Sequence, residues 1–159
     1  MLEQLIEMGK QQLSGSLTQK AGLNSSQIDQ SFGVAQDSML DTLKNEALSG
    51  NISGIMSLFN GQSTADASNP IVKNFAGNFT TGIIEKLGLS ESTAKMVSDT
   101  VVPFLVQKFA SKDSGNATDE GDLMKMIGLD SDSAIGGMLK NILGDSGGSL
   151  LKGLGGFFN

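Results

Sequence analysis

The chain has 159 residues and a net charge of -6 at pH 7, a length that suits one domain with its own core. It contains no Cys, His, Arg, Trp or Tyr. Disulfides, thiolate or imidazole metal sites, the commonest catalytic base and bidentate guanidinium contacts are therefore excluded. An acidic chain with no cluster of Lys also lacks the charge that drives nucleic-acid binding, so we expect no nucleic-acid partner and no cofactor.

The N-terminal segment MLEQLIEMGKQQL is amphipathic, but Glu3 and Glu7 interrupt its apolar pattern. A secretory signal has a basic start and an uninterrupted apolar stretch. The longest apolar run, residues 101–106, is far shorter than the ~20 residues of a spanning helix. We therefore expect a soluble, cytoplasmic protein.

Two helices are predicted between residues 25 and 61. The first begins near Ile28 and carries one apolar stripe at helical spacing. Its members are Ile28, Phe32, Ala35, Met39, Leu43 and Ala47. Gly50 suits the left-handed residue that ends such a helix. The segment NISGIMSLFNG then predicts a short helix between two glycines, followed by a polar loop at residues 62–68.

Asn69 and Pro70 predict the start of the next helix, because Asn caps the first turn and Pro is tolerated at its first position. This helix runs to Leu87, and Gly77 and Gly82 flank Phe79 on it. Glycine inside a helix is typical of a close approach by another backbone, from the same chain or from a partner.

A further helix follows Ser90, with apolar residues at Ala94, Val97, Val101, Leu105 and Phe109. Pro103 lies inside this pattern. An interior Pro removes one hydrogen bond and crowds the preceding turn, so a kink or a break is expected near residues 99–102.

A Gly-Leu-(Ser/Asn/Asp) motif occurs three times, in AGLNSSQI, LGLSESTA and IGLDSDSA. We interpret each copy as a corner between helices: glycine ends one helix in a left-handed conformation, leucine folds back as in a Schellman motif, and the polar residue caps the next helix. The corner residues are Gly22, Leu23, Gly88, Leu89, Gly128 and Leu129. The third copy is not a calcium loop, because Ala134 and Asn141 stand at ligand positions.

No segment alternates apolar and polar residues over a strand's length. The sequence therefore predicts an all-α fold, a compact array of short amphipathic helices joined by these corners. We expect a single helical domain over residues 1–159, with a core at 25–111, a polar linker at 112–122, and C-terminal helices with a Gly-rich amphipathic tail at 123–159.

The segments LSGNISGIMSLFNG and IIEKLGLSESTAKMVSDTVVPFLVQKF resemble the YidB-like family of bacterial domains of unknown function. In that family a Gly-rich short helix precedes a KLG corner and a helix interrupted by Pro. Asn51, Ile52 and Ser53 depart from the family's richer glycine content. The resemblance implies a compact multi-helix domain and carries over no catalytic residue.

The tail SLLKGLGGFFN is a candidate interaction surface, because its large apolar residues fall at helical spacing. They are Leu150, Leu151, Leu154, Phe157 and Phe158. We expect docking on the chain's own core first, self-association second and membrane contact third, since Lys152 is its one basic residue.

We expect no enzymatic activity. The residue types present leave a Ser nucleophile with a Lys base as a possible catalytic pair, such as Ser92 with Lys95 or Lys95 with Ser98. The same residues are equally well explained as the solvent-exposed face of a capped helix. The sequence favours a non-catalytic interaction or scaffold module that binds an unknown protein or itself. The alternative is a module that binds a lipid surface or a small apolar ligand, through the tail or the Phe, Met and Leu interior.

Overall fold

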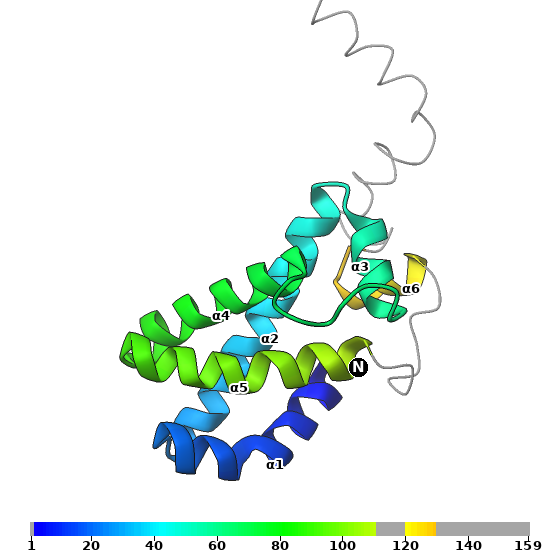
Figure 1. The fold of residues 1–159 in the computed structure, drawn as a ribbon. Helices are drawn as coiled ribbons and strands as arrows, with labels where there is room; N and C mark the ends of the chain where they lie inside the picture. The colour runs from blue at the N-terminus through cyan, green and yellow to red at the C-terminus, as the bar shows by residue number, and fades with distance from the viewer. Residues whose placement is uncertain (1, 111–119, 130–159) are drawn as a thin grey trace, which may run out of the picture. The chain divides into compact units, whose positions relative to one another are not determined.

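The computed structural model describes residues 2–110 and 120–129. These residues form six helices and no strand, which confirms the all-α prediction (Figure 1). The helices are α1 (Leu2–Ala21), α2 (Ser25–Leu48), α3 (Ile52–Phe59), α4 (Pro70–Leu87), α5 (Glu91–Ala110) and α6 (Glu120–Met126).

The chain divides into two compact units, Met1–Ala117 and Thr118–Asn159, where the sequence predicted one domain. The division falls inside the predicted polar linker at 112–122. That segment, KDSGNATDEGD, carries no large apolar side chain, so it has little to bury in a shared core. Helix α6 belongs to the second unit.

Four long helices of the first unit enclose its core. Helix α1 contacts α2 and α5, and α4 contacts the same two helices from the other side, as Figure 1 shows. The predicted stripe of α2 is buried, from Ile28 to Ala47. Helix α2 packs against α4, α1 and α3. Helix α3 closes one end, where the ring of Phe59 stands edge-on to that of Phe109 at a centroid distance of 4.7 Å.

Each helix from α1 to α4 ends at a glycine with positive φ, at Gly22, Gly50, Gly61 and Gly88. At Gly50 the backbone forms the paired bonds of a Schellman motif, Gly50 N–H to Ala47 O (3.0 Å) and Asn51 N–H to Glu46 O (2.9 Å). These glycines occur in the sequence where the helices stop. The position of each of these helix ends is therefore determined by residues close to it in sequence.

The three predicted corners differ in their hydrogen bonds. Gly88 adopts φ 65° as predicted, but its N–H donates to Ile84 O at 3.1 Å, the single bond of the simpler left-handed stop. The Schellman form predicted for this corner is therefore wrong, and Leu89 is only half-buried. Gly128 does form a Schellman motif, and both Leu23 and Leu129 are buried.

Pro103 does not break its helix. Helix α5 continues from Glu91 to Ala110 with Pro103 inside it, so the break expected near residues 99–102 is absent. Pro103 itself is exposed, whereas Val102 and Leu105 beside it are buried. Packing of the buried residues on both sides holds the helix together across the missing N–H.

Candidate functional site

Sequence reasoning left Ser92, Lys95 and Ser98 as the remaining nucleophile candidates. The structure places Lys95 Nζ 3.2 Å from Asp99 Oδ2 on the exposed face of α5. Ser98 is buried, and Ser92 is exposed. In residues 2–110 and 120–129 no three His, Cys, Asp or Glu side chains gather as metal ligands would, and no helix there is long and apolar enough to span a bilayer.

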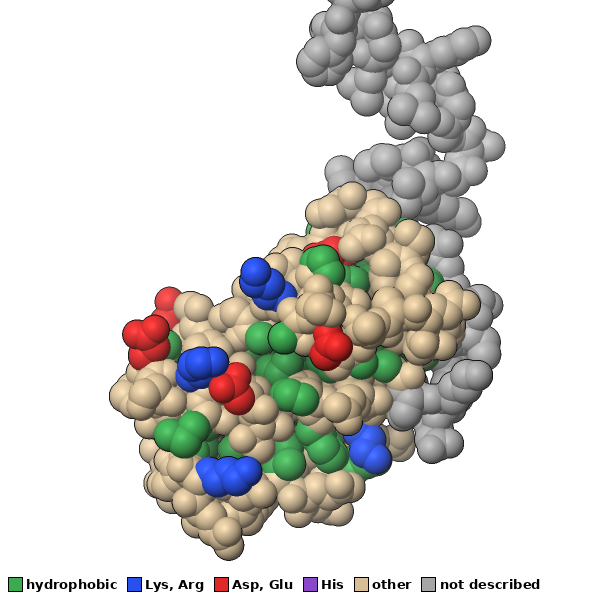
Figure 2. Space-filling view, in the orientation of Figure 1, with side chains coloured by type: hydrophobic (Ala, Val, Ile, Leu, Met, Phe, Trp, Pro, Cys, Tyr) green, Lys and Arg blue, Asp and Glu red, His purple; other side chains and the backbone are tan. Residues whose placement is uncertain are grey.

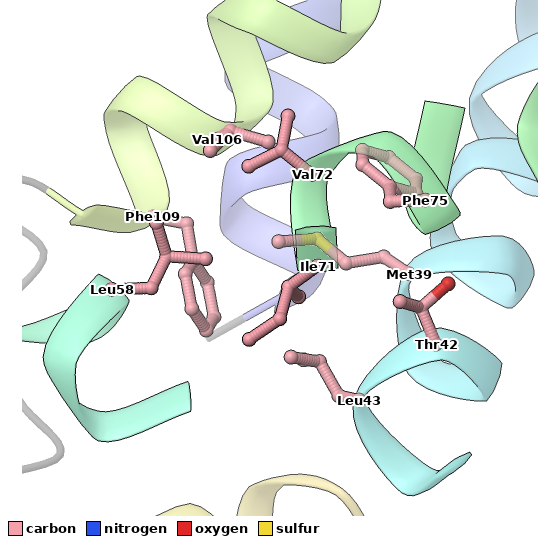
Figure 3. A pocket seen from close by; sticks show the side chains of 9 residues that line it. All are labelled: Met39, Thr42, Leu43, Leu58, Ile71, Val72, Phe75, Val106 and Phe109. Atoms are coloured by element: carbon pink, nitrogen blue, oxygen red, sulfur yellow. The ribbon is translucent and has the colours of Figure 1, made fainter. Parts of the chain in front are cut away.

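The apolar interior of the first unit contains a small cavity of about 10 Å³. Figure 3 shows its lining side chains converging from α2, α3, α4 and α5. They are Met39, Thr42, Leu43, Leu58, Ile71, Val72, Phe75, Val106 and Phe109. Such a volume admits at most about one water molecule, and an apolar wall gives that water few partners. The cavity therefore has no room for a small apolar ligand.

A ladder of side-chain contacts runs along the antiparallel pair α2 and α4. Asn74 Nδ2 donates to Glu46 Oε1 (3.0 Å), and Asn78 Nδ2 donates to Thr42 Oγ1 (3.0 Å), one turn further along each helix. Thr42 Oγ1 in turn donates to Ser38 O at 2.7 Å. Residues four apart lie on one face of a helix. The ladder therefore fixes the register between α2 and α4.

Beside this ladder lies an open polar groove of about 400 Å³. Its lining residues are Thr42, Asn45, Glu46, Lys73, Asn74, Gly77 and Asn78. Carboxamide, carboxylate and ammonium groups dominate this list. The groove is thus built for hydrogen bonds rather than for apolar burial.

The Glu46 carboxylate in the groove accepts hydrogen bonds at both of its oxygens. Its Oε2 accepts a hydrogen bond from Asn51 Nδ2 (2.6 Å), and its Oε1 accepts the one from Asn74. One carboxylate therefore joins the start of α3 to α2 and α4. The two N–H donors hold the carboxylate in one position.

Two glycines of α4 have opposite surroundings. A Cβ at Gly82 would stand 2.6 Å from Val34 Cγ1, so α2 and α4 approach closely there. At Gly77, apart from its chain neighbours and the adjacent backbone of α4, no atom of the described residues lies within 4 Å of that position, and the residue is exposed in the groove. The predicted close approach within the chain is thus confirmed at Gly82. At Gly77 the space is open.

Apolar side chains also reach the surface on one face of the first unit, around α5 (Figure 2), where Lys and Asp or Glu side chains lie nearby. In the described part of the chain the exposed large apolar residues are Met8 (38%), Leu48 (54%) and Met96 (44%). They come from three different helices. Scattered single residues of this kind are normal for a protein surface.

The predicted tail surface, Leu150, Leu151, Leu154, Phe157 and Phe158, lies outside the described residues. So do residues 130–141 of the rejected calcium loop. Within the described residues the candidate site is the groove between α2 and α4.

Comparison with known proteins gives no match to a family model, to a curated protein or to a solved structure. The resemblance to the YidB-like family therefore stays a prediction.

Sequence reasoning missed Asn45, Glu46, Lys73, Asn74 and Asn78. The spacing of Asn74, Asn78 and Gly82 at steps of four was visible and puts them on one face of α4. The second wall of the groove comes from α2. Asn74 contacts Glu46, 28 residues earlier in the sequence, and Asn78 contacts Thr42, 36 residues earlier. No local pattern reports that pairing.

Proposed function

We propose that this chain is a non-catalytic helical interaction module that binds a protein partner in the groove between α2 and α4. The observation that carries the proposal is the groove itself, about 400 Å³ of open space lined by hydrogen-bonding side chains. Its volume lies within the ~300–1,000 Å³ typical of binding pockets.

The chemistry of the groove supports binding rather than catalysis. Glu46 is the carboxylate there, and both of its oxygens accept amide N–H groups from Asn51 and Asn74. The neighbouring carboxamides of Asn45, Asn74 and Asn78 have no acid or base function near neutral pH. The Glu46 carboxylate, hydrogen-bonded at both oxygens, joins α2 to α4 and to the start of α3.

The alternative function, binding of a small apolar ligand in the interior, has less support. The interior cavity measures about 10 Å³, and its lining side chains point toward one another in Figure 3. Lipid binding through the tail rests on residues outside the described part of the chain. Self-association remains within the proposal, since the partner in the groove can be a second copy.

Site-specific photo-crosslinking tests this function. A photoreactive amino acid replaces Lys73 in the groove, or, as a matched control, the exposed Gln19 of α1. We expect a covalent adduct from position 73 in cells that make the protein, and little from position 19. The mass of the adduct distinguishes a second copy from another protein. No adduct from position 73, or equal yields from both positions, contradicts the proposal.

A further inference from the structure

The sequence contains one Asn-Gly pair, Asn60–Gly61, and this pair directly follows α3. Asn60 is exposed, and Gly61 has no side chain to hinder an approach to its nitrogen. We propose that Asn60 is a site of spontaneous deamidation, and that the fold holds the reaction back until the end of α3 opens. This modification site is separate from the groove between α2 and α4.

The reaction needs the chain's own backbone and a water molecule. The Gly61 nitrogen forms a bond to Cγ of Asn60, the Cγ–Nδ2 bond breaks, and Nδ2 leaves as ammonia together with the proton of the Gly61 N–H. The product is a succinimide ring. Water then adds to either carbonyl carbon of the ring and opens it, to aspartate or to isoaspartate, without any oxidant or reductant.

The native backbone keeps the two reacting atoms apart. Asn60 has ψ 5°, so the Gly61 nitrogen eclipses the Asn60 nitrogen about the Cα–C bond, and the side chain stands about a third of a turn away. Gly61 N–H donates to Leu58 O (3.2 Å). Gln62 N–H donates to Ser57 O (2.7 Å), which completes a Schellman motif. Ring closure requires a rotation of ψ that breaks both bonds, so the closed end of α3 blocks the reaction.

Packing of Phe59 determines how often this end opens. Phe59 is the last residue of α3, and it is buried with its ring edge-on to that of Phe109 at a centroid distance of 4.7 Å. This contact ties the residue before Asn60 to α5. The ends of elements open at a lower free-energy cost than the whole fold. Release of Phe59 is therefore the step that permits deamidation in the native chain.

Neither product fits the native helix end. Aspartate adds a negative charge after the last turn of α3, where the helix dipole is also negative. Isoaspartate adds an atom to the main chain before Gly61, so the paired bonds of the Schellman motif cannot form again with their native geometry. Deamidation therefore accumulates in chains whose α3 has opened, and it weakens the closure of α3 further.

The test follows deamidation of the full chain in one mildly alkaline buffer, with and without guanidinium chloride. Peptide mass spectrometry measures the change from NH₂ to OH at each Asn. In denaturant we expect Asn60 to react before the other Asn residues, and Gly61→Ala to slow its reaction. Without denaturant the reaction at Asn60 should be at least about tenfold slower. This factor should match the hydrogen-exchange protection of the Gln62 amide, because one opening frees both groups.

Two variants with the same change separate local opening from global unfolding. Phe59→Leu removes the ring contact at the end of α3, and Phe79→Leu removes a buried ring from α4. Phe59→Leu should speed the native reaction about five- to thirtyfold. Phe79→Leu lowers global stability and should leave the rate within about twofold of the parent. Circular dichroism shows whether each variant is folded.

Three results overturn the proposal: equal rates at Asn60 with and without denaturant, another Asn that reacts first in denaturant, or equal acceleration by the two Phe variants. If a Phe variant does not fold, the parent chain decides. A native rate at Asn60 that departs from the protection of the Gln62 amide then overturns the proposal as well.

Discussion

Gly82 and Val34 are in contact across α4 and α2, so closely that an added Cβ on Gly82 would stand 2.6 Å from Val34 Cγ1. Val34 is buried and β-branched, and its χ1 has one strongly preferred rotamer in a helix. The side chain cannot easily turn away. The distance between the two helices therefore depends on the missing side chain at Gly82.

Gly82→Ala should lower the free energy of unfolding. Overpacking costs ~1–3 kcal/mol, which exceeds the gain of up to ~1 kcal/mol in helix propensity. Urea denaturation followed by circular dichroism measures the difference. Adding Val34→Ala to Gly82→Ala should recover part of the loss, because it removes the clashing methyl group. A single Gly82→Ala variant that is more stable than the parent would contradict the close contact.

Gly33→Ala should have the opposite effect. Gly33 is exposed in the middle of α2 and has no neighbour within 4 Å of the Cβ position. Alanine should therefore raise the free energy of unfolding by ~0.5–1 kcal/mol. A shift of the denaturation midpoint to higher urea at constant m-value checks this expectation. A lower midpoint would show that Gly33 has a packing role.

Gly88→Ala should destabilise the corner between α4 and α5. Gly88 adopts φ 65° and ψ 26°, a left-handed conformation that costs an L-residue ~1–2 kcal/mol. We expect a loss of ~1 kcal/mol or more in the free energy of unfolding, and a smaller loss for Gly88→Asn, since Asn tolerates this region better. Equal stability of the Ala and Asn variants would argue against backbone strain.

Asn69 should contribute through both ends of its carboxamide. Oδ1 accepts from Ile71 N (2.9 Å) and caps α4, while Nδ2 donates to Thr64 O (3.1 Å) in the loop. Asn69→Ala should cost ~1–2 kcal/mol. Asn69→Asp keeps the acceptor and loses the donor, so the stability of this variant should lie between those of the parent protein and of Asn69→Ala. Thermal unfolding of the three proteins orders them.

The Asp66 carboxyl should titrate below its ordinary pKa. Hydrogen bonds from the Ser68 hydroxyl foremost, then from Ser68 N–H (2.8 Å), lower its pKa in the folded chain. A lowered folded pKa gives stability that is present above the unfolded value near ~3.9 and is lost as the pH falls through the folded value. Carboxyl carbon resonances report the titration directly.

Ser68→Ala should raise the pKa of Asp66 toward its ordinary value, because the hydroxyl donor is removed and the backbone donor stays. Ser53→Ala, in α3, is the control and should leave the titration unchanged. An unchanged pKa in Ser68→Ala would assign the shift to another cause.

Pro103→Ala should stabilise α5. Pro103 is exposed within the helix and supplies no N–H to the preceding turn. Alanine restores that donor and loses no buried contact, so the free energy of unfolding should rise, by at most ~3 kcal/mol. A lower melting temperature of the variant would instead show that a bend at Pro103 is needed for packing against α1 and α4.

The sequence predicted what depends on neighbouring residues. The Asn69–Pro70 start, the stop at Gly88 and the buried stripe of α2 all appear as expected, since capping, left-handed glycine and helical period act within a few residues. At Pro103 the sequence predicted a kink or a break and did not decide between them, because tertiary packing determines whether a helix continues past the local cost of Pro. The groove was not predicted either, since the contact of Asn78 with Thr42 joins residues 36 apart.

The helix ends at glycine depend on residues close in sequence, whereas the ladder between α2 and α4 depends on residues far apart in sequence. The two features therefore form at different stages of folding. A helix with its own stop can form within about a microsecond, before distant segments meet. The groove requires α2 and α4 in register, and it is therefore a property of the folded chain alone. A partner that occupies it holds the chain in its native state, and each tenfold excess over the dissociation constant raises the free energy of unfolding by about 1.4 kcal/mol. Protection from proteolysis would then report the partner's presence even where no activity can be assayed.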